Sequence, residues 1–356
     1  MEDSYRVIGM MSGTSLDGLD ICLARFTHQN RQWQFKAERA VTVEYDPEWQ
    51  NRLRFQPGLT ADKLLQLDHQ YGKWLGHQVN GFLKDAGIDK NEIDHISSHG
   101  HTLFHQPKAG YTFQLGCGPE IAMETGIAAV TDFRRQDVAL GGQGAPLVPI
   151  GDAMLFPQYD ACLNLGGFAN ISYAKNNQRL AYDICPVNYV LNPLARKLGH
   201  EFDKGGSLAR SGVLRENLLH QLDSLEYYVQ PPPKSLGAEW VQQCIDPLLA
   251  AGETKALDLL RTFTEHAARQ IGKVLNLAEI EKCLITGGGA YNTYLIERLK
   301  THSQCDITIP DDKLVNFKEA LIFAFLGTLK IRDEINVLSS VTGSQQDHSS
   351  GIVYRL

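Results

Sequence analysis

One segment near the start of the chain, GMMSGTSLDGLD at residues 9–20, constrains the fold more than any other. Apolar runs at residues 5–8 and 21–24 enter and leave it, which predicts two β-strands joined by a polar turn. Its glycines at positions 9, 13 and 18 allow the backbone to approach a ligand closely, with amides free to face it. The chain therefore opens with a strand, a ligand-accessible turn and a second strand.

The polar side chains of this turn are typical of a phosphate site. Hydroxyl donors that suit phosphate oxygens are Ser12, Thr14 and Ser15, and carboxylates that suit a hydrated Mg²⁺ are Asp17 and Asp20. The alternative is a plain polar hairpin. A two-residue hairpin needs only one Asn-Gly or Asp-Gly pair, so this richer segment favours the binding turn.

Composition excludes several classes of protein. The chain has 356 residues, of which 43% are hydrophobic and 21% charged, enough for two globular domains. A net charge of −7 argues against a nucleic-acid partner. The acidic N-terminus does not resemble a signal peptide, and the absence of a run of about 18 apolar residues argues against a membrane span.

The cysteines indicate a reducing environment. Seven are scattered without a C-x-x-C pair, and most lie in apolar runs: Cys22, Cys117, Cys162, Cys185, Cys244, Cys283 and Cys305. This pattern is typical of reduced core thiols in a cytoplasmic protein, so we expect a cytoplasmic location.

Apolar periodicity predicts the same strand plan twice. In the first half, strands are expected at 33–45 and 94–98, with a helix at 64–82 between them. In the second half, strands are expected at 161–165, 171–174, 179–184 and 283–286, and helices at 187–198 and 256–277. A further amphipathic helix is expected from residue 289, with one apolar face formed by Tyr291, Leu295, Ile296 and Leu299.

This repetition predicts an internal duplication. We expect two α/β domains, residues 1–135 and 136–356, that face each other across a central cleft. The first carries one phosphate turn and part of a sugar site, and the second carries the remaining turns. The proline cluster at 231–233 indicates a loop within the second domain.

Three glycine-rich turns follow apolar strands, at Gly13, Gly166-Gly167 and Gly287-Gly288-Gly289. The chain lacks the GxxxxGK[ST] phosphate loop, and no GxGxxG joins its first strand to a helix. Two hairpin turns and one strand-to-helix turn are the number expected for two phosphate-binding turns and one adenosine-binding turn. At the third turn, amides at the start of the helix near Ala290 are also able to face phosphate or ribose.

Five blocks carry a specific resemblance that covers essentially the whole chain: GMMSGTSLDGLD (9–20), SHGHT (98–102), TDFRRQDVALGGQGAPLVP (131–149), NLGGFANIS (164–172) and ITGGGAYN (285–292). In this order they resemble the anhydro-N-acetylmuramic acid kinases of the sugar kinase, Hsp70 and actin superfamily. The resemblance implies duplicated ribonuclease H-like domains and a kinase that uses ATP and Mg²⁺. Its implied substrate is 1,6-anhydro-N-acetylmuramic acid, which is opened by water and phosphorylated in peptidoglycan recycling. A homodimer is a further expectation.

The resemblance implies that Asp183, in AYDICPVNYVLN, is the catalytic base that deprotonates the attacking water. From the residues alone, an ordinary turn aspartate at a strand end is an equal alternative. The block departs from the family pattern, because Cys185 and Val187 replace two glycines and Asn192 replaces a closing Asp. Side chains at these positions are expected to crowd the turn or change its backbone angles.

The remaining expected site residues are also implied by the resemblance. The nucleotide is assigned to Ser12, Gly13, Thr14, Ser15, Asp17, Asn164, Gly166, Gly167, Gly287, Gly288, Gly289 and Asn292, with Asp17 also assigned to the metal. The substrate is assigned to His99, Thr102, Arg135, Asp137, Asn188 and Glu319.

Structural alternatives accompany several of these assignments. Arg135 and Asp137 suit an ordinary structural ion pair, and Glu319 suits a solvent-facing helix position. The histidines at 99, 101 and 105 have a spacing that zinc tolerates, but no nearby cysteine or carboxylate completes a site. At the level of function, the alternatives are a related amino-sugar kinase and an inactive ATP-binding regulator. The three glycine turns, Asp17 and Asp183 argue against an inactive chain.

Overall fold

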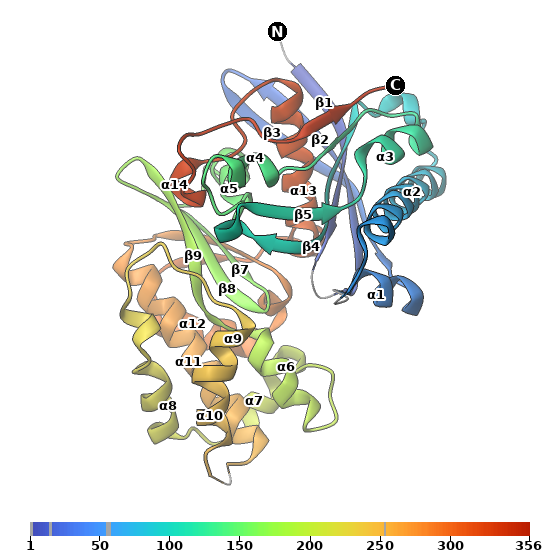
Figure 1. Cartoon of the computed structure of the whole chain (residues 1–356). Coiled ribbons are helices and arrows are strands. Elements are labelled where there is room, and N and C mark those ends of the chain that lie inside the picture. Colours follow the sequence, from blue (N-terminus) through green and yellow to red (C-terminus); the bar gives the residue numbers. More distant parts are fainter. Residues whose placement is uncertain (1–2, 14–15, 55–57, 253) are drawn as a thin grey trace. The chain divides into compact units, whose positions relative to one another are not determined.

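The structure is a computed structural model that describes residues 3–13, 16–54, 58–252 and 254–356. It divides into two compact units, and Figure 1 shows the elements of each. The first unit contains residues 1–156 and 317–356, and the second contains residues 157–316. The division differs from the expected boundary at 135/136, because residues 136–156 stay with the first unit and the C-terminal segment returns to it.

The first unit combines one sheet with flanking helices. Its strands are β1 (Asp3–Ser12), β2 (Gly18–Gln29), β3 (Gln32–Glu44), β4 (His95–Gln106), β5 (Tyr111–Leu115), β6 (Ala129–Thr131) and β12 (Ile352–Tyr354). Its helices are α1 (Pro47–Leu53), α2 (Ala61–Ala86), α3 (Gly118–Thr125), α4 (Arg135–Ala139), α5 (Val148–Leu155), α14 (Ser339–Thr342) and the larger part of α13 (Asp312–Ile331).

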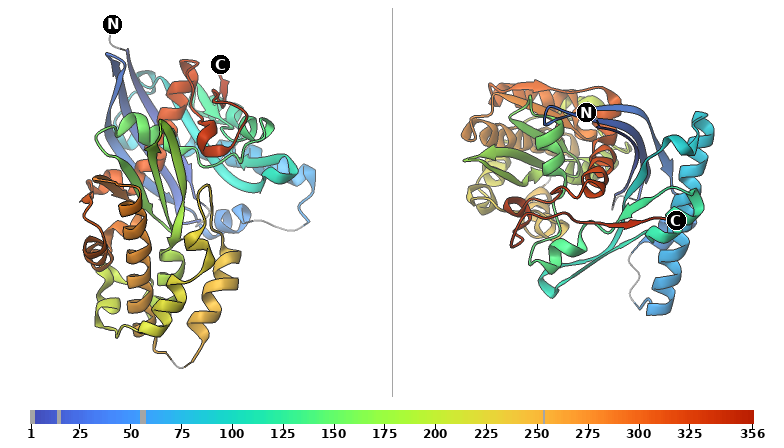
Figure 2. Two further views of the ribbon diagram at one scale, coloured as in Figure 1. Left: turned by 90° about the vertical axis from the view of Figure 1, so that its left-hand side faces the viewer. Right: turned by 90° about the horizontal axis from the view of Figure 1, so that it is seen from above.

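The sheet of the first unit has the order β12-β6-β4-β1-β2-β3, with β5 paired to β4. Strands β1, β2 and β3 are antiparallel neighbours, whereas β4 runs parallel to β1 and β6 runs parallel to β4. Helix α13 lies against the β1–β3 strands (Figure 2). A side chain at Gly9 of β1 would collide with the backbone of Ala320 and with Ala324, so this glycine permits close packing of the helix on the sheet.

The second unit has its own sheet and a larger set of helices. Its strands are β7 (Ala161–Leu165), β8 (Phe168–Lys175), β9 (Gln178–Pro186), β10 (Lys282–Thr286) and β11 (Asp306–Thr308). Its helices are α6 (Asn188–Arg196), α7 (Ser207–Ser211), α8 (Glu216–Asp223), α9 (Ala238–Trp240), α10 (Asp246–Ala250), α11 (Ala256–Leu277) and α12 (Thr293–His302).

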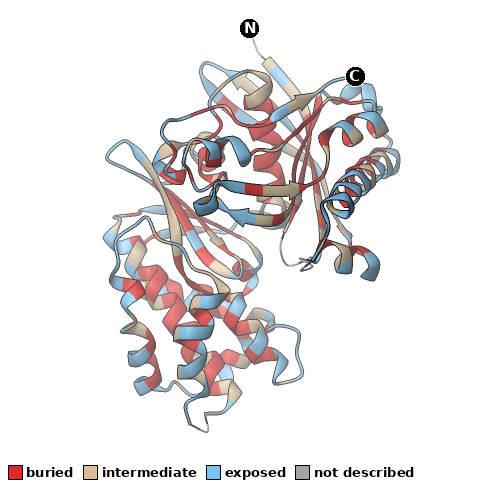
Figure 3. Cartoon of the chain, viewed as in Figure 1, coloured by how far each residue is buried: buried red, intermediate tan, exposed pale blue. Residues whose placement is uncertain are grey.

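The second sheet repeats the plan of the first. Its order is β11-β10-β7-β8-β9, with β7, β8 and β9 antiparallel and β10 and β11 running parallel to β7. In both units, three antiparallel strands are followed by parallel strands on the far side of the first one. The predicted duplication is therefore confirmed. Buried residues line helix α11, while α2 of the first unit presents an exposed outer face (Figure 3).

Most predicted elements are present, and helix α11 has the expected bounds. Two predictions are wrong in part. Strand β4 continues to Gln106 instead of ending near residue 98, because it also pairs with β5. A 3₁₀ turn, η6 (Gly288–Tyr291), separates the third glycine turn from α12, which leaves Tyr291 44% exposed rather than on the apolar face.

Five of the seven cysteines are buried, as predicted for core thiols. Within the described ranges, no helix is long and apolar enough to cross a membrane.

Candidate functional site

The first glycine turn is only partly available to a ligand. Ser12 is 2% exposed, and its hydroxyl is bonded to Nδ1 of His101 at 2.9 Å and to the Tyr45 hydroxyl at 2.8 Å. Because this hydroxyl has partners within the protein, Ser12 stabilises the base of the turn instead of presenting a free donor. Asp17 is exposed beyond it. Thr14 and Ser15 lie outside the described residues.

Gly9 and Gly18 were expected to let a ligand approach the backbone, but in the structure they allow close packing of neighbouring elements. Gly9 makes room for α13, and a side chain at Gly18 would meet the backbone of Val43 on the neighbouring strand β3. Of the three glycines, Gly13 remains at the turn itself, where its carbonyl accepts the amide of Leu16 at 3.3 Å.

The second glycine turn is tied to the start of helix α6. The Gly166 carbonyl accepts the Asn188 amide at 3.2 Å, and the Gly167 carbonyl accepts the amides of Val187 at 2.8 Å and Tyr189 at 3.0 Å. The turn is therefore held in place by the segment that directly follows strand β9. This arrangement places Asn188, which was assigned to the substrate, beside the second glycine turn.

The third glycine turn packs beside the second. Gly287 has a φ of 85°, and a side chain there would meet the amide oxygen of Asn164. A Cβ at Gly289 would lie 2.7 Å from that of Leu165, whereas one at Gly288 would meet only the Asn188 amide nitrogen at 4.0 Å. Gly288 is therefore the open position of this turn, and its two neighbours allow close packing.

Asn292 has a structural partner. It caps helix α12, where its side-chain oxygen accepts the Leu295 amide at 3.0 Å, and it is 8% exposed. Gly206 packs against the same side chain, since a Cβ at that glycine would collide with it. The contacts of Asn292 favour a role in shaping the turn over direct contact with a nucleotide.

Asp183 lies on strand β9, opposite Asn170 of β8 next to a register shift. It is half-buried, and its Oδ2 accepts the backbone amide of Leu236 at 2.9 Å. Burial raises the pKa of this carboxyl group, and the Leu236 hydrogen bond opposes that rise. Among the described residues, Oδ1 has no hydrogen-bond partner, so one oxygen is fixed and the other is available as a base.

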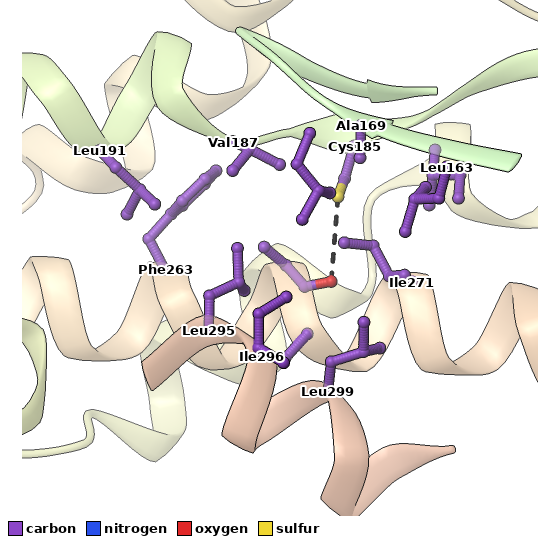
Figure 4. Packing of buried hydrophobic residues seen from close by; sticks show 14 of the residues in the cluster. Leu163, Ala169, Cys185, Val187, Leu191, Phe263, Ile271, Leu295, Ile296 and Leu299 are labelled. Carbon is purple, nitrogen blue, oxygen red and sulfur yellow. Dashed lines mark hydrogen bonds between the residues drawn. The ribbon is translucent and has the colours of Figure 1, made fainter. Parts of the chain in front are cut away.

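The departures at Cys185 and Val187 are accommodated in the core. Both side chains are 0% exposed and pack toward α11 and α12, next to Phe263, Ile271 and Leu295 (Figure 4). Val187 has a φ of −130°, and Cys185 is not among the residues with positive φ. The two side chains leave from the other face of the turn and do not crowd it, whereas Val187, with a ψ of −96°, has backbone angles outside the usual helical and strand regions.

A second polar cluster lies in the first unit around Arg134. Its Nε donates to Nε2 of His99 at 2.8 Å, and its Nη1 donates to the Gly144 carbonyl at 2.6 Å. Because Nε2 of His99 accepts, Nδ1 must carry the proton and donate to the Gly100 carbonyl at 2.8 Å. Burial and the Arg134 charge hold the pKa of His99 well below its usual range, so this imidazole is neutral.

Two carboxylates share the electrostatic surroundings of this cluster. Burial raises the pKa of Glu319, while the charges of Lys318 and Arg134 oppose the rise. Burial also raises the pKa of Asp20 to about 6, and the nearby negative charge of Glu319 adds to the shift. Asp20 accepts the Thr42 hydroxyl at 2.6 Å. A guanidinium, a neutral imidazole and two carboxylates are suited to bind a polar organic molecule.

Arg135 and Asp137, which were assigned to the substrate, do not share the contacts of Arg134. The Arg135 side chain is 58% exposed and lies 3.4 Å from Asp132, in a structural ion pair of the kind that the alternative predicted. Asp137 is 0% exposed and accepts the Gly144 amide at 2.6 Å and the Thr342 hydroxyl at 2.7 Å. These contacts stabilise the glycine-rich loop at 141–144 and leave Asp137 away from solvent.

Three further polar residues on strand β4 also have hydrogen-bond partners within the protein. Thr102 is partly exposed on β4 and accepts the Gln114 amide at 3.4 Å. His101 bonds to Ser12 and to the Leu53 carbonyl at 3.1 Å, and His105 bonds to Thr112 at 3.1 Å. The described part of the chain contains no group of three potential metal-ligating side chains.

Sequence reasoning missed three residues of these clusters. The resemblance assigned Arg135 instead of its neighbour Arg134, and the pattern FRRQD contains no signal that separates a half-buried arginine from an exposed one. Tyr227 and Lys234, which contact the Asp183 backbone, belong to a loop whose sequence shows no periodicity. The segment PKSLGAE at 233–239 keeps part of a further block of the family that the chain resembles, and it was the available signal for this loop.

Two sheets of the same strand order, with glycine turns after β1, β7 and β10, define the fold of the sugar kinase, Hsp70 and actin superfamily. The family model described as anhydro-N-acetylmuramic acid kinase matches residues 5–356. The chain belongs to this family, which confirms the predicted membership.

Individual relatives of the chain carry the same family description. An anhydro-N-acetylmuramic acid kinase from Shewanella woodyi is 33% identical over 98% of both chains, and one from Shewanella amazonensis is 36% identical over 96% of both. Among solved structures, component A of (R)-2-hydroxyglutaryl-CoA dehydratase from Acidaminococcus fermentans is similar at a TM-score of 0.45. It is 12% identical, and the match covers 90% of this chain and 96% of that one. The two kinases thus match this chain over nearly its full length.

Proposed function

We propose that this protein is an ATP-dependent kinase that hydrolyses the anhydro bridge of 1,6-anhydro-N-acetylmuramic acid and phosphorylates the sugar to N-acetylmuramic acid 6-phosphate. Family membership over residues 5–356 supports the reaction class. The observation that carries the proposal is Asp183, a half-buried carboxylate with one oxygen held by a backbone amide and the other, among the described residues, without a protein partner.

Asp183 acts as the general base. Its free oxygen takes a proton from water as the water oxygen bonds to the anomeric carbon and the bond from that carbon to O6 breaks. The released O6 takes the terminal phosphoryl group of ATP, which leaves as ADP. Burial raises the pKa of Asp183, which makes its carboxylate a stronger base than that of an ordinary aspartate.

The second unit supplies two of the glycine turns that we assign to the nucleotide. Gly288 leaves open space in front of its turn, and Gly167 has a similarly open face, so both turns fit a ligand that approaches the backbone. Asn164 and Asn188 add amide groups beside them. Mg²⁺ typically binds through nucleotide phosphates and one or two carboxylates, and the exposed Asp17 provides a carboxylate of this kind. Bound Mg²⁺ supplies charge neutralisation of the phosphates.

The first unit supplies the sugar contacts. We assign the lactyl carboxylate of the substrate to Arg134, because a guanidinium binds carboxylate in a planar, bidentate manner. The sugar hydroxyls are assigned to Glu319, with His99 holding Arg134 in place. Thr102 adds a hydroxyl, while Asp137 and Asn292 are reassigned to structural support by their buried contacts.

The experiment that tests this function measures ADP formation with and without the anhydro sugar. We expect ADP only when both the sugar and Mg²⁺ are present. Asp183→Asn keeps the shape of the side chain and removes the base, so kcat is expected to fall by about 10²–10⁴-fold, with a much smaller change in KM. Sugar-independent ADP formation, or a fully active Asp183→Asn variant, contradicts the proposal.

A further inference from the structure

Asp183 is contacted from one side by the loop that connects helices α8 and α9. The Tyr227 hydroxyl, in the short helix η4 (Glu226–Val229), donates to the Asp183 carbonyl at 2.6 Å. The Asp183 amide donates to the Lys234 carbonyl at 3.3 Å, and the Leu236 amide donates to Asp183 Oδ2 at 2.9 Å. Backbone and side chain of Asp183 are therefore both held by a single loop.

The two ends of this loop are joined to each other. Nζ of Lys234 donates to the Tyr227 carbonyl at 2.9 Å and lies 4.5 Å from the centre of the Tyr227 ring. Hydrogen bonds thus close a ring that runs from Asp183 to Tyr227, to Lys234 and back to Asp183. A closed ring of this kind limits the movement of strand β9 at the residue that carries the carboxylate.

The loop is anchored to the core by the next tyrosine. The Tyr228 hydroxyl bonds to Nε2 of His266 on helix α11 at 2.9 Å, and Nδ1 of His266 bonds to Asp223 at 2.6 Å. Tyr227 and Tyr228 are 6% and 8% exposed, and Trp240 packs against both rings. Two adjacent tyrosines of similar burial therefore have different partners: one contacts Asp183 and the other contacts α11.

We propose that Tyr227 and Lys234 are positioning residues that aim Asp183 at the attacking water, and that the Leu236 amide selects Oδ1 as the basic oxygen. The proposal rests on the proposed role of Asp183 as general base. Its physical basis is that a base must lie within hydrogen-bond reach of the proton that it removes, and that a displacement of about 1 Å can cost about 10²-fold in rate.

The charged and titratable groups around Asp183 come from three directions. Cys185 follows on the same strand, Tyr227 and Lys234 approach from the loop, and the Lys273 side chain of α11 influences Lys234. The Leu236 amide stabilises the ionised carboxylate, so its loss is expected to raise the pKa of Asp183.

The first test compares Tyr227→Phe with Tyr228→Phe, which each remove one hydroxyl from adjacent, similarly buried rings. We expect Tyr227→Phe to lower kcat for the anhydro sugar by about tenfold or more, with KM within about twofold of the wild type. Tyr228→Phe should lower the melting temperature and keep kcat within about twofold. Equal kcat values for the two variants overturn the role of Tyr227.

The second test measures the pH profile of kcat/KM for Leu236→Pro, which lacks the amide proton, against Leu236→Ala, which keeps it. The base is active when ionised, so activity is lost as the pH falls through its pKa. We expect the acidic limb of Leu236→Pro to lie about one pH unit higher than that of Leu236→Ala. Coincident limbs overturn the assignment of Oδ2 to Leu236.

Failure of the positioning role is distinguishable from failure of the proposed function. If Asp183→Asn is inactive while Tyr227→Phe has normal kcat, only the positioning role is wrong. If Asp183→Asn is fully active, the base itself is misassigned. Should Tyr227→Phe fail to fold, Lys234→Met gives the same comparison, because it removes the bond to the Tyr227 carbonyl and keeps the length of the side chain.

Discussion

At the scale of single residues, neighbours of the same chemical type have different environments. Arg134 donates to His99 and to the Gly144 carbonyl, whereas Arg135 points to solvent beside Asp132. The difference follows from the position of each residue at the start of helix α4. Only one of two consecutive helical side chains faces the core, and the local sequence does not say which.

Arg134→Lys is expected to lower kcat/KM for the anhydro sugar by about 10–100-fold, while Arg135→Lys stays within about twofold. Lysine lacks the planar fork that donates to His99 and the Gly144 carbonyl together, and each bond to a charged group contributes about 1.5–3 kcal/mol. Steady-state kinetics check this, with melting temperatures to establish that both variants fold. Equal losses in the two variants would remove Arg134 from the substrate site.

Asp20→Asn is expected to increase the stability of the folded protein at pH 7 by about 2 kcal/mol. The pKa of Asp20 is about 6 in the folded protein, against an ordinary value of 3.8, because the side chain is buried. The folded state therefore binds more protons between these values, and stability falls as the pH rises through this window. Asparagine avoids that loss and still accepts the Thr42 hydroxyl.

Denaturant unfolding at pH 7 and at pH 4 measures this effect, which should be large at pH 7 and small at pH 4. Asp17→Asn is the control, because this nearby carboxylate is exposed and its replacement should change stability by less than about 0.5 kcal/mol. A gain of the same size at both pH values would contradict burial as its cause.

At the scale of elements, the glycine turns divide into positions that pack and positions that are open. Gly287 and Gly289 lie against Asn164 and Leu165, and Gly288 faces open space. The third turn thus uses two glycines to bring β7 and β10 together, and it leaves open space at Gly288, where we propose that the nucleotide binds. The same reasoning explains Cys185 and Val187, whose side chains fill the core on the far side of the second turn.

Gly288→Val is expected to weaken ATP binding by about tenfold or more without a large loss of stability, because the new side chain occupies the open face of the turn. Gly289→Ala should instead destabilise the fold by about 1–3 kcal/mol, since its Cβ would lie 2.7 Å from that of Leu165. Calorimetry with ATP and thermal unfolding check the pair. Unchanged ATP affinity in Gly288→Val would exclude this turn from the nucleotide site.

At the scale of the whole molecule, the C-terminal segment completes the first unit. Strand β12 pairs with β6, and α13 packs on β1. Where α13 enters this unit, Lys318 and Asp152 form a buried ion pair of 3.0 Å, with each side chain 4% exposed. The unit therefore depends on residues from both ends of the chain.

Lys318→Ala is expected to destabilise the protein by about 3–5 kcal/mol, because it removes the cation that lies 3.0 Å from the buried Asp152 carboxylate. The double variant Lys318→Met, Asp152→Leu should recover most of this loss, since apolar residues of similar volume replace buried pairs well. Thermal unfolding of the two variants measures the difference. A single variant as stable as the wild type would show that Asp152 does not need its partner.

The sequence predicted those features of the fold that depend on a local pattern of residues. Strand alternation, helical periodicity and glycine turns identified the duplicated α/β plan, and helix α11 has the expected bounds, because these signals arise from neighbours within a few residues. The motifs of the kinase family are also contiguous stretches of the chain, so the sequence alone was enough to identify the family. Asp183 was singled out by the same means and remains a prediction.

Only the tertiary structure showed which of the expected polar side chains have hydrogen-bond partners within the protein. Ser12, Asp137 and Asn292 were expected at the site, but distant partners or a helix end bind their polar atoms. The unit boundary also depended on contacts between segments far apart in the chain. Burial and long-range hydrogen bonds arise when remote segments pack together, so a local pattern in the sequence carries no record of them.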